Sequence, residues 1–201
     1  MKRLIVILFI LAAWSTHAWP MDGPLCPVIE YACYNQDLLS DLEDLGARDW
    51  ELDAIEVITR SSSRSPVAIH DTDCGAAGFA HFSPGNLDLG ITWEGSCAYD
   101  DEVWRDQILA VLYSEDSAII QLTAWRRIIN QAIRPARRAG CDDDCLVVVA
   151  SVANSSPTLA NELGLATEWD PWEIIDGYEA SRPGNLHRER RANRLRAYLL
   201  D

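Results

Sequence analysis

The chain carries one segment that is apolar on every side, Leu146-Val147-Val148-Val149-Ala150-Ser151-Val152-Ala153. An element without a polar face has to be covered by neighbours all round, so we expect this segment to be fully buried. The polar run that follows it, Asn154-Ser155-Ser156-Pro157, ends it. A buried helix and a buried strand both fit an apolar run of this length, and we expect the helix.

Helical periodicity surrounds this segment on both sides. Leucine spacing predicts a short helix over 37–45 that Gly46 ends, and apolar spacing predicts a second helix over 49–59. Further helices are expected over 101–113, from 117 to a close at Gly140 with a kink or a division at Pro135, and over 159–163, 172–178 and 187–200. Between 61 and 97 the helical period fails, and serine, glycine and proline alternate with short apolar pieces, which predicts a small β-hairpin region. The fold class is therefore α+β, mainly helical, with a β-hairpin insert after the second helix.

The first 18 residues have the order of an export signal. Lys2 and Arg3 precede an apolar run over 4–14, and Thr16-His17-Ala18 places small residues at the cleavage positions. The run is too short for a hydrocarbon core of ~30 Å, which needs ~20 residues, so we expect no stable membrane insertion after cleavage. The sequence predicts a signal peptide over 1–18, one domain over 19–201, and a periplasmic or extracellular location.

The charge of the chain limits its partners. The formal net charge is −14, and Lys2 is the only lysine. Nucleic acid and anionic lipid are bound through clusters of cations, so an acidic chain of this kind fits neither. A cationic or neutral ligand suits it better. We expect a monomer that requires no cofactor.

Six cysteines in an exported chain indicate disulfides. Their spacing favours local pairs, although other pairings remain open. Cys26 and Cys33 bracket an N-terminal loop, and Cys74 and Cys97 bracket the segment richest in glycine and aromatic residues. Cys141 and Cys145 bracket an acidic loop between two helices, and a disulfide there is favoured over a metal site in an oxidising compartment.

The insert after the second helix holds most of the candidate chemistry. Two histidines and two carboxylates lie within twelve residues, His70, Asp71, Asp73 and His81, and the preceding helix carries Glu56. Cleavage of a glycosidic bond requires one protonated carboxyl and one carboxylate that activates water. A helix end that faces a hairpin can supply such a pair. The alternative interpretation is that these carboxylates are solvated surface side chains of an acidic protein and have no catalytic role.

Two segments carry a resemblance to a known family. Gly75-Ala76-Ala77-Gly78-Phe79-Ala80-His81-Phe82-Ser83-Pro84-Gly85 resembles the glycine-rich segment that follows the catalytic glutamate in the lysozyme-like superfamily, as in bacterial chitosanases and lytic transglycosylases. The region from Glu115 to Gly140, with its Pro135-Ala136 pair, is similar to a chitosanase-type helix. The resemblance implies a lysozyme-like fold and a substrate made of amino sugars, either peptidoglycan or chitosan.

The resemblance also implies roles for individual residues. The general base falls on Asp71, with Asp73 as the alternative, and the general acid on Glu56. A groove around His70, Phe79, His81 and Asn154 would then hold sugar rings. Arg60 stands where that family has its glutamate, so a non-catalytic envelope-binding or inhibitory protein on the same scaffold is the alternative function.

Two further interpretations concern the same residues and the tryptophans. His70, Asp71, Asp73 and His81 would suit a divalent ion and thus a metal-dependent peptidoglycan peptidase or amidase, but a complete ligand set is not evident and we expect no metal site. Some of the tryptophans could be platforms on which sugar rings stack, although tryptophans on helical stripes are mostly core residues. The candidates are Trp93, Trp104, Trp125, Trp169 and Trp172.

Overall fold

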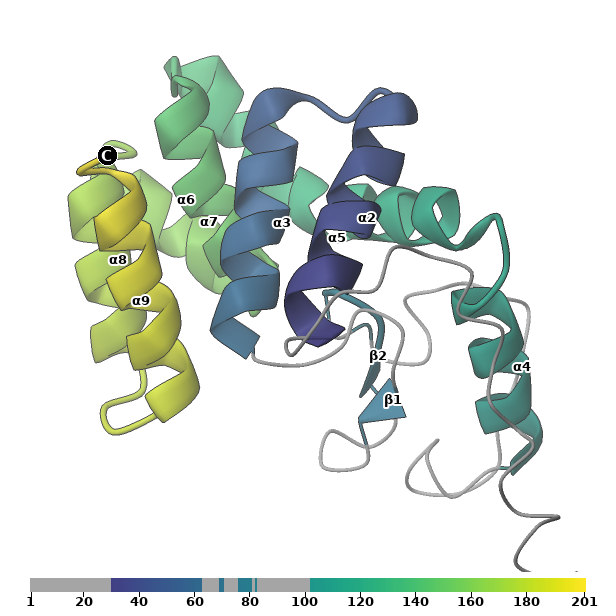
Figure 1. The fold of residues 1–201 in the computed structure, drawn as a ribbon. Helices are drawn as coiled ribbons and strands as arrows, with labels where there is room; N and C mark the ends of the chain where they lie inside the picture. Colours follow the sequence, from purple (N-terminus) through teal and green to yellow (C-terminus); the bar gives the residue numbers. More distant parts are fainter. Residues whose placement is uncertain (1–29, 63–68, 71–75, 81, 83–101) are drawn as a thin grey trace, which may run out of the picture. The chain divides into compact units, whose positions relative to one another are not determined.

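The computed structural model describes the backbone of residues 30–62, 69–70, 76–80, 82 and 102–201, and the side chains of 37–61, 78–80, 82 and 106–201. Across these residues the chain is mainly helical, as predicted (Figure 1). The elements in chain order are α2 (Glu30–Asp44), α3 (Asp49–Ser62), β1 (Ile69–His70), β2 (Ala76–Ala77), α4 (Glu102–Leu112), α5 (Ser117–Ala139), α6 (Asp143–Ala153), α7 (Pro157–Ala166), α8 (Pro171–Ala180) and α9 (Leu186–Tyr198). The contacts of residues 31–201 group them into one compact unit.

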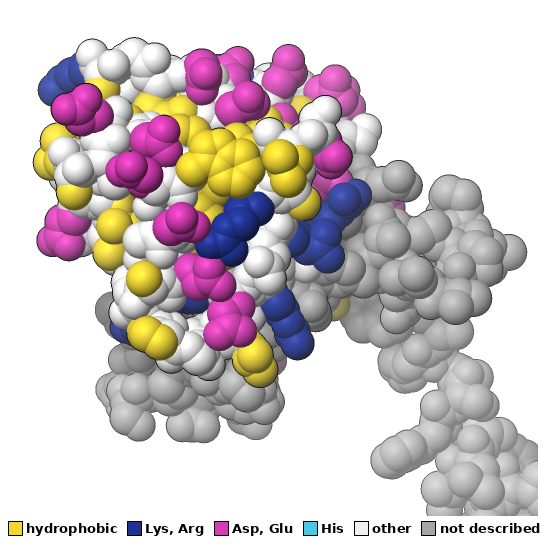
Figure 2. All heavy atoms as spheres, turned by 90° about the vertical axis from the view of Figure 1, so that its left-hand side faces the viewer, with side chains coloured by type: hydrophobic (Ala, Val, Ile, Leu, Met, Phe, Trp, Pro, Cys, Tyr) yellow, Lys and Arg dark blue, Asp and Glu magenta, His cyan; other side chains and the backbone are white. Residues whose placement is uncertain are grey.

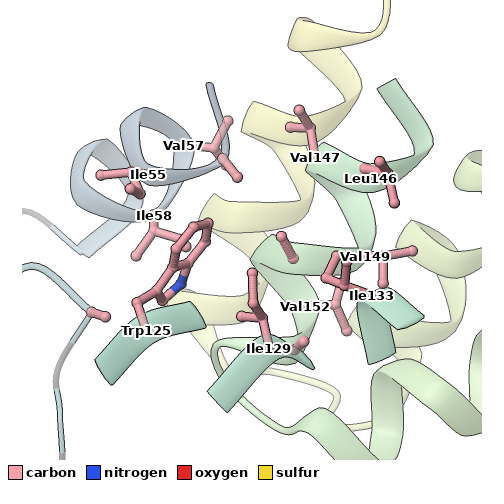
Figure 3. Close-up of a cluster of buried hydrophobic side chains, with 14 of the residues drawn as sticks. Ile55, Val57, Ile58, Trp125, Ile129, Ile133, Leu146, Val147, Val149 and Val152 are labelled. Atoms are coloured by element: carbon pink, nitrogen blue, oxygen red, sulfur yellow. The ribbon is translucent and has the colours of Figure 1, made fainter. Parts of the chain in front are cut away.

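The apolar segment 146–153 forms most of α6, which confirms the predicted buried helix. The side chain of Asp142 caps its first turn by accepting a hydrogen bond of 3.0 Å from the backbone N–H of Cys145. From Cys145 to Ala153 each of its side chains is buried. This burial follows from the packing of α6 against α3, α5, α7 and α8. Side chains from α3, α5 and α6 meet in the core shown in Figure 3.

Helix α5 passes through Pro135 without a break. Of the kink or division predicted at this proline, the division does not occur, and the kink stays a prediction. A proline inside a helix removes one backbone hydrogen bond and costs ~3 kcal/mol, but α5 packs against both α6 and α7, and that burial offsets the loss. Gly140 ends the helix with φ of 91° in the left-handed region, as predicted, and Cys141 N–H donates back to Ala136 C=O at 3.1 Å.

The described part of the insert contains a two-residue strand pair. β1 and β2 are antiparallel, with Ile69 opposite Ala77 and His70 opposite Ala76. The residues 71–75 that connect them lie outside the described ranges, so the β-hairpin itself stays a prediction.

Phe79 and Ala80 are each held against a helix by one hydrogen bond. Phe79 N–H donates to Gln121 Oε1 of α5 at 2.9 Å, and the Asn154 side chain at the end of α6 donates to Ala80 C=O at 3.2 Å. Gly78 has φ of +74°, and a Cβ placed on it would lie 2.3 Å from Gln121 Oε1. Only glycine therefore fits this approach to α5.

Candidate functional site

Glu56, the predicted general acid, lies on α3 and forms an ion pair with Arg60 one turn later. Its side chain is 33% exposed, so it reaches solvent. A general acid has to contact the leaving oxygen, and the Arg60 guanidinium occupies one oxygen of the Glu56 side chain. Asp71, Asp73 and His81 lie outside the described residues, as does the side chain of His70. The predicted carboxylate pair thus stays a prediction.

Of the predicted groove residues, Phe79 and Asn154 are described. The contact between Asn154 and Ala80 brings the end of α6 next to the segment 78–82, as the groove prediction requires. Phe79, however, is only 1% exposed, and its ring packs edge-on against Trp125 and Phe82 with centroid distances of 6.2 and 5.5 Å. Its apolar ring belongs to the core in this structure, and a sugar at the surface would not reach it.

Cys141 and Cys145 form a disulfide between the end of α5 and the first turn of α6. This is the local pair that spacing favoured. Cys26, Cys74 and Cys97 lie outside the described residues, as does the side chain of Cys33, so their pairing stays a prediction.

Next to this disulfide is a cleft with a volume of about 340 Å³, which we call the acidic cleft. Its carboxylates come from Asp142 and Asp144 of the α6 N-terminal region and from Glu168, and its aromatic side chains are Trp169 and Trp172. Trp172 is 41% exposed. Figure 2 turns the side of the molecule that holds α8 and α9 toward the viewer, and apolar side chains gather there among Asp and Glu side chains. The cleft therefore offers an aromatic surface beside negative charge.

The turn between α7 and α8 places the two tryptophans. Glu168 and Trp169 have φ of 51° and 66°, a left-handed conformation that non-glycine residues seldom adopt. Trp169 N–H donates to Gly164 C=O at 2.8 Å, and the ring lies directly on Gly164, where a Cβ would be 2.3 Å from it. Strained turns of this kind are frequent at ligand sites, because surrounding structure has to hold them in place.

The side chain of Asp144 is held by a hydrogen bond from a tyrosine. The hydroxyl oxygen of Tyr198 lies 3.1 Å from an oxygen of Asp144 and 3.1 Å from an oxygen of Asp53. Burial raises the pKa of Tyr198, and the neighbouring Asp53 carboxylate raises it further. The phenol therefore stays protonated at neutral pH and can donate its hydrogen bond.

A second carboxylate on α3, Glu51, is fully buried and held by two arginines. Arg126 of α5 donates to its two oxygens at 2.9 and 2.6 Å, and the Arg48 side chain donates at 2.9 and 3.2 Å. Burial raises the pKa of Glu51, but these hydrogen bonds outweigh it and lower the pKa to about 2. Because its oxygens are fully engaged, Glu51 has a structural role and is not a candidate acid or base.

Two arginines of α9, Arg188 and Arg191, are buried. Arg191 is 2% exposed, and its guanidinium donates to the Ser61 hydroxyl at 3.2 Å, to Ser151 C=O at 3.0 Å and to the Ser155 hydroxyl at 2.6 Å. Burial lowers the pKa of Arg191. Its contacts join α9 to the ends of α3 and α6, so this cation is part of the packing between helices.

No family model, curated protein or solved structure matches the chain. Within the described ranges, His, Cys, Asp and Glu side chains form no group of three or more that could hold a metal ion. None of the helices in those ranges is long and apolar enough to cross a membrane. The resemblance to the lysozyme-like superfamily therefore stays a prediction made from two segments of sequence.

Sequence reasoning named Trp169 and Trp172 but did not separate them from core tryptophans such as Trp125, which is 0% exposed. It also missed Asp142, Asp144 and Glu168 as neighbours of Trp172. One signal was present in the sequence: Trp172 follows Asp170-Pro171, a helix start, and the first turn of a helix is often at the surface. The grouping of the carboxylates depends on the meeting of α5, α6 and α8, which local pattern does not encode.

Proposed function

We propose that this chain is an exported protein that binds an amino-sugar polysaccharide of the cell envelope through the acidic cleft. The observation that carries the proposal is the 41% exposed ring of Trp172 in a cleft whose lining includes Asp142, Asp144 and Glu168. The scaffold that we propose is the lysozyme-like α+β fold, with a β-hairpin insert after the second helix.

The chemistry of an amino sugar matches both parts of the cleft. A pyranose ring has a face of C–H groups, and such a face stacks on an aromatic ring with favourable contact energy. An unacetylated amino group becomes a cation in weakly acidic solution, where it is attracted to carboxylates and to the face of a tryptophan. The sequence already favoured a cationic or neutral ligand, and the acidic cleft is a place where such a ligand would bind.

The contact between Glu56 and Arg60 favours binding over cleavage. In the hydrolytic form of the proposal, Glu56 protonates the leaving oxygen and Asp71 or Asp73 activates water. Arg60 occupies one Glu56 oxygen and therefore competes with the leaving oxygen for the contact that the first of these roles requires. Zymography on peptidoglycan and on chitosan tests this form directly: clearing by the wild type that is lost in Glu56→Gln and in Asp71→Asn would establish the hydrolase.

The binding form is tested by co-sedimentation of the purified protein with insoluble chitosan, chitin and peptidoglycan. We expect chitosan to retain the wild type better than chitin does, because chitin lacks free amino groups. Trp172→Ala should weaken the binding by about tenfold, since one aromatic contact is worth on the order of 1 kcal/mol or more.

Trp172→Ala leaves the net charge unchanged, which separates stacking in the cleft from general attraction between an acidic protein and a cationic polymer. Tyr113→Ala is the matched control, because Tyr113 is an exposed aromatic residue, 59% exposed, outside the lining of the acidic cleft. Equal retention of the wild type and Trp172→Ala would contradict the proposal, and so would equal losses in the two variants.

A further inference from the structure

A second cleft, with a volume of about 540 Å³, lies between the start of α3 and one face of α5. We call it the arginine cleft. Five arginines line it: Arg48, Arg126, Arg127, Arg134 and Arg137. The whole chain has 17 basic residues against 31 acidic ones, so the gathering of five arginines at one cleft opposes the general charge of the protein.

The acid in this lining does not neutralise the cleft. Glu51 is the one acidic side chain among the described lining residues, and its oxygens are engaged by Arg48 and Arg126. Arg134 and Arg137 are exposed members of the same lining. They follow one face of α5, because residues three, four and seven apart on a helix lie on the same side. Positive charge therefore remains in excess in the cleft.

Several of these guanidinium groups are held in place before any ligand arrives. The guanidinium of Arg48 lies 4.9 Å from the ring centre of Trp50, and that of Arg137 lies 5.3 Å from it. Arg126 is fixed by two hydrogen bonds to Glu51. Groups that are already ordered lose less conformational entropy on binding, so a ligand gains more from each contact.

We propose that the arginine cleft binds a ligand that carries a phosphate group. A phosphate ester has a charge of about −1.5 to −2 and three acceptor oxygens, so it can accept hydrogen bonds from two or three guanidinium groups at once. A single carboxylate has less negative charge and fewer acceptor oxygens than a phosphate group, so it would engage fewer of the guanidinium groups in this lining. The cleft volume is in the range of small-molecule sites. This proposal is independent of polysaccharide binding at the acidic cleft.

Calorimetric titration of the full chain with inorganic pyrophosphate at physiological salt tests the assignment. Citrate, which has a similar charge near neutral pH, serves as the comparison probe. We expect pyrophosphate to bind more tightly than citrate, and Arg134→Gln to weaken pyrophosphate binding by about tenfold, since one hydrogen bond to a charged group accounts for a factor of this size. Arg134→Lys should give an intermediate affinity, because lysine keeps the positive charge but lacks the planar guanidinium, whose N–H groups can donate two parallel hydrogen bonds.

Arg138→Gln is the matched control. Arg138 is an exposed arginine near the end of α5 and outside the lining of the arginine cleft, so its loss changes the net charge equally. We expect it to change the affinity by less than about twofold, because Arg138 is outside the lining and salt weakens the attraction between an exposed charge and the ligand. Absence of pyrophosphate binding by the folded wild type overturns the proposal. Equal effects of Arg134→Gln and Arg138→Gln also overturn it, and citrate binding as tight as that of pyrophosphate overturns the phosphate assignment.

Discussion

Glu51 and Glu56 lie on the same helix and have opposite environments. Glu51 has no exposed surface and accepts hydrogen bonds from two arginines, whereas Glu56 is a third exposed and pairs with Arg60 across one helical turn. A buried carboxylate is stable only with such partners, because desolvation penalises an unpaired charge. An exposed i, i+4 pair contributes only ~0.3–0.5 kcal/mol. The two residues thus differ in what they contribute to stability.

We predict that Glu51→Gln lowers the free energy of unfolding at pH 7 by about 2 to 3 kcal/mol, the size expected for charge-assisted hydrogen bonds that are lost in a buried site. The folded pKa of about 2 is below the ordinary value of 4.5, so the carboxylate stabilises the fold above pH 4.5. This stabilisation is lost as the pH falls from 4.5 toward 2. Urea unfolding of the wild type and of the variant at pH 7 and at pH 3 measures it.

Glu56→Gln is the control in the same helix, and we expect it to change stability by less than about 0.5 kcal/mol. If Glu51→Gln were no less stable than Glu56→Gln at pH 7, the buried ion pair would not have the assigned role. The difference between the wild type and Glu51→Gln should shrink at pH 3.

The pairing of Glu51 with Arg126 was not predictable from the sequence. The two residues are 75 positions apart, and nothing in the local pattern of α3 distinguishes Glu51 from Glu56. Glu56 was chosen as the acid because it lies near the helix end, and its position on α3 is as expected. The solvent exposure of the tryptophans was also not predictable from the sequence, since Trp125 and Trp172 both lie on helices and only Trp125 is in the core.

At the scale of elements, apolar spacing predicted the helices well and their ends less well. Helix α3 continues to Ser62, beyond the predicted end at 59, and the hydroxyls of Thr59 and Ser61 bond back to carbonyls in the same helix. The continuity of α5 through Pro135 has a tertiary cause, because the helix packs on α6 and α7. Helix propensity accounts for the free-energy cost of the proline, but it does not include the packing against neighbouring helices that offsets this cost.

Contact between α7 and the turn before α8 depends on a glycine. A Cβ at Gly164 would lie 2.3 Å from carbons of the Trp169 ring, which is buried and cannot move without disturbing the acidic cleft. We predict that Gly164→Ala destabilises the protein by about 1 to 3 kcal/mol through overpacking, and that it changes the near-ultraviolet circular dichroism of the tryptophans. Thermal unfolding and the dichroism spectrum are the measurements.

Gly177→Ala, in α8, is the comparison for this prediction. A Cβ there would meet the end of the flexible Leu163 side chain at 2.5 Å, which can shift, and alanine is favoured over glycine inside a helix by up to ~1 kcal/mol. We expect Gly177→Ala to be close to neutral. A loss of stability as large as that of Gly164→Ala would show that the tryptophan contact is not the cause.

At the scale of the whole molecule, one cleft is lined by arginines and another by carboxylates, and both clefts include residues from the end of α5. Arg137 lines the arginine cleft, and Ala139 and Gly140 line the acidic cleft, so opposite charges are presented within a few residues of each other in the chain. The sequence predicted an acidic protein as a whole. It did not predict the arginine cleft, because Arg48 comes from a different part of the chain from the arginines of α5.

The helical character of the fold was predictable because apolar periodicity is a local signal that each helix carries by itself. The lysozyme-like arrangement and the carboxylate pair remain predictions. They depend on how the segment 63–101 sits against the helices, and most of that segment lies outside the described residues. The contacts of Gln121 and Asn154 with residues 79 and 80 give the position where it approaches α5 and α6.

The burial of residues 145–153 of α6 on every side determines how water reaches this part of the backbone. Its amide protons can exchange with solvent deuterium only when the neighbouring helices α3, α5, α7 and α8 separate from it together. We predict that the amides of residues 147–153 exchange last in the chain, with a protection that matches the global free energy of unfolding, whereas those at the exposed end of α9 exchange early. Mass spectrometry of deuterated fragments reads out both, and rapid labelling of α6 in the native state would mean that the bundle opens around its centre.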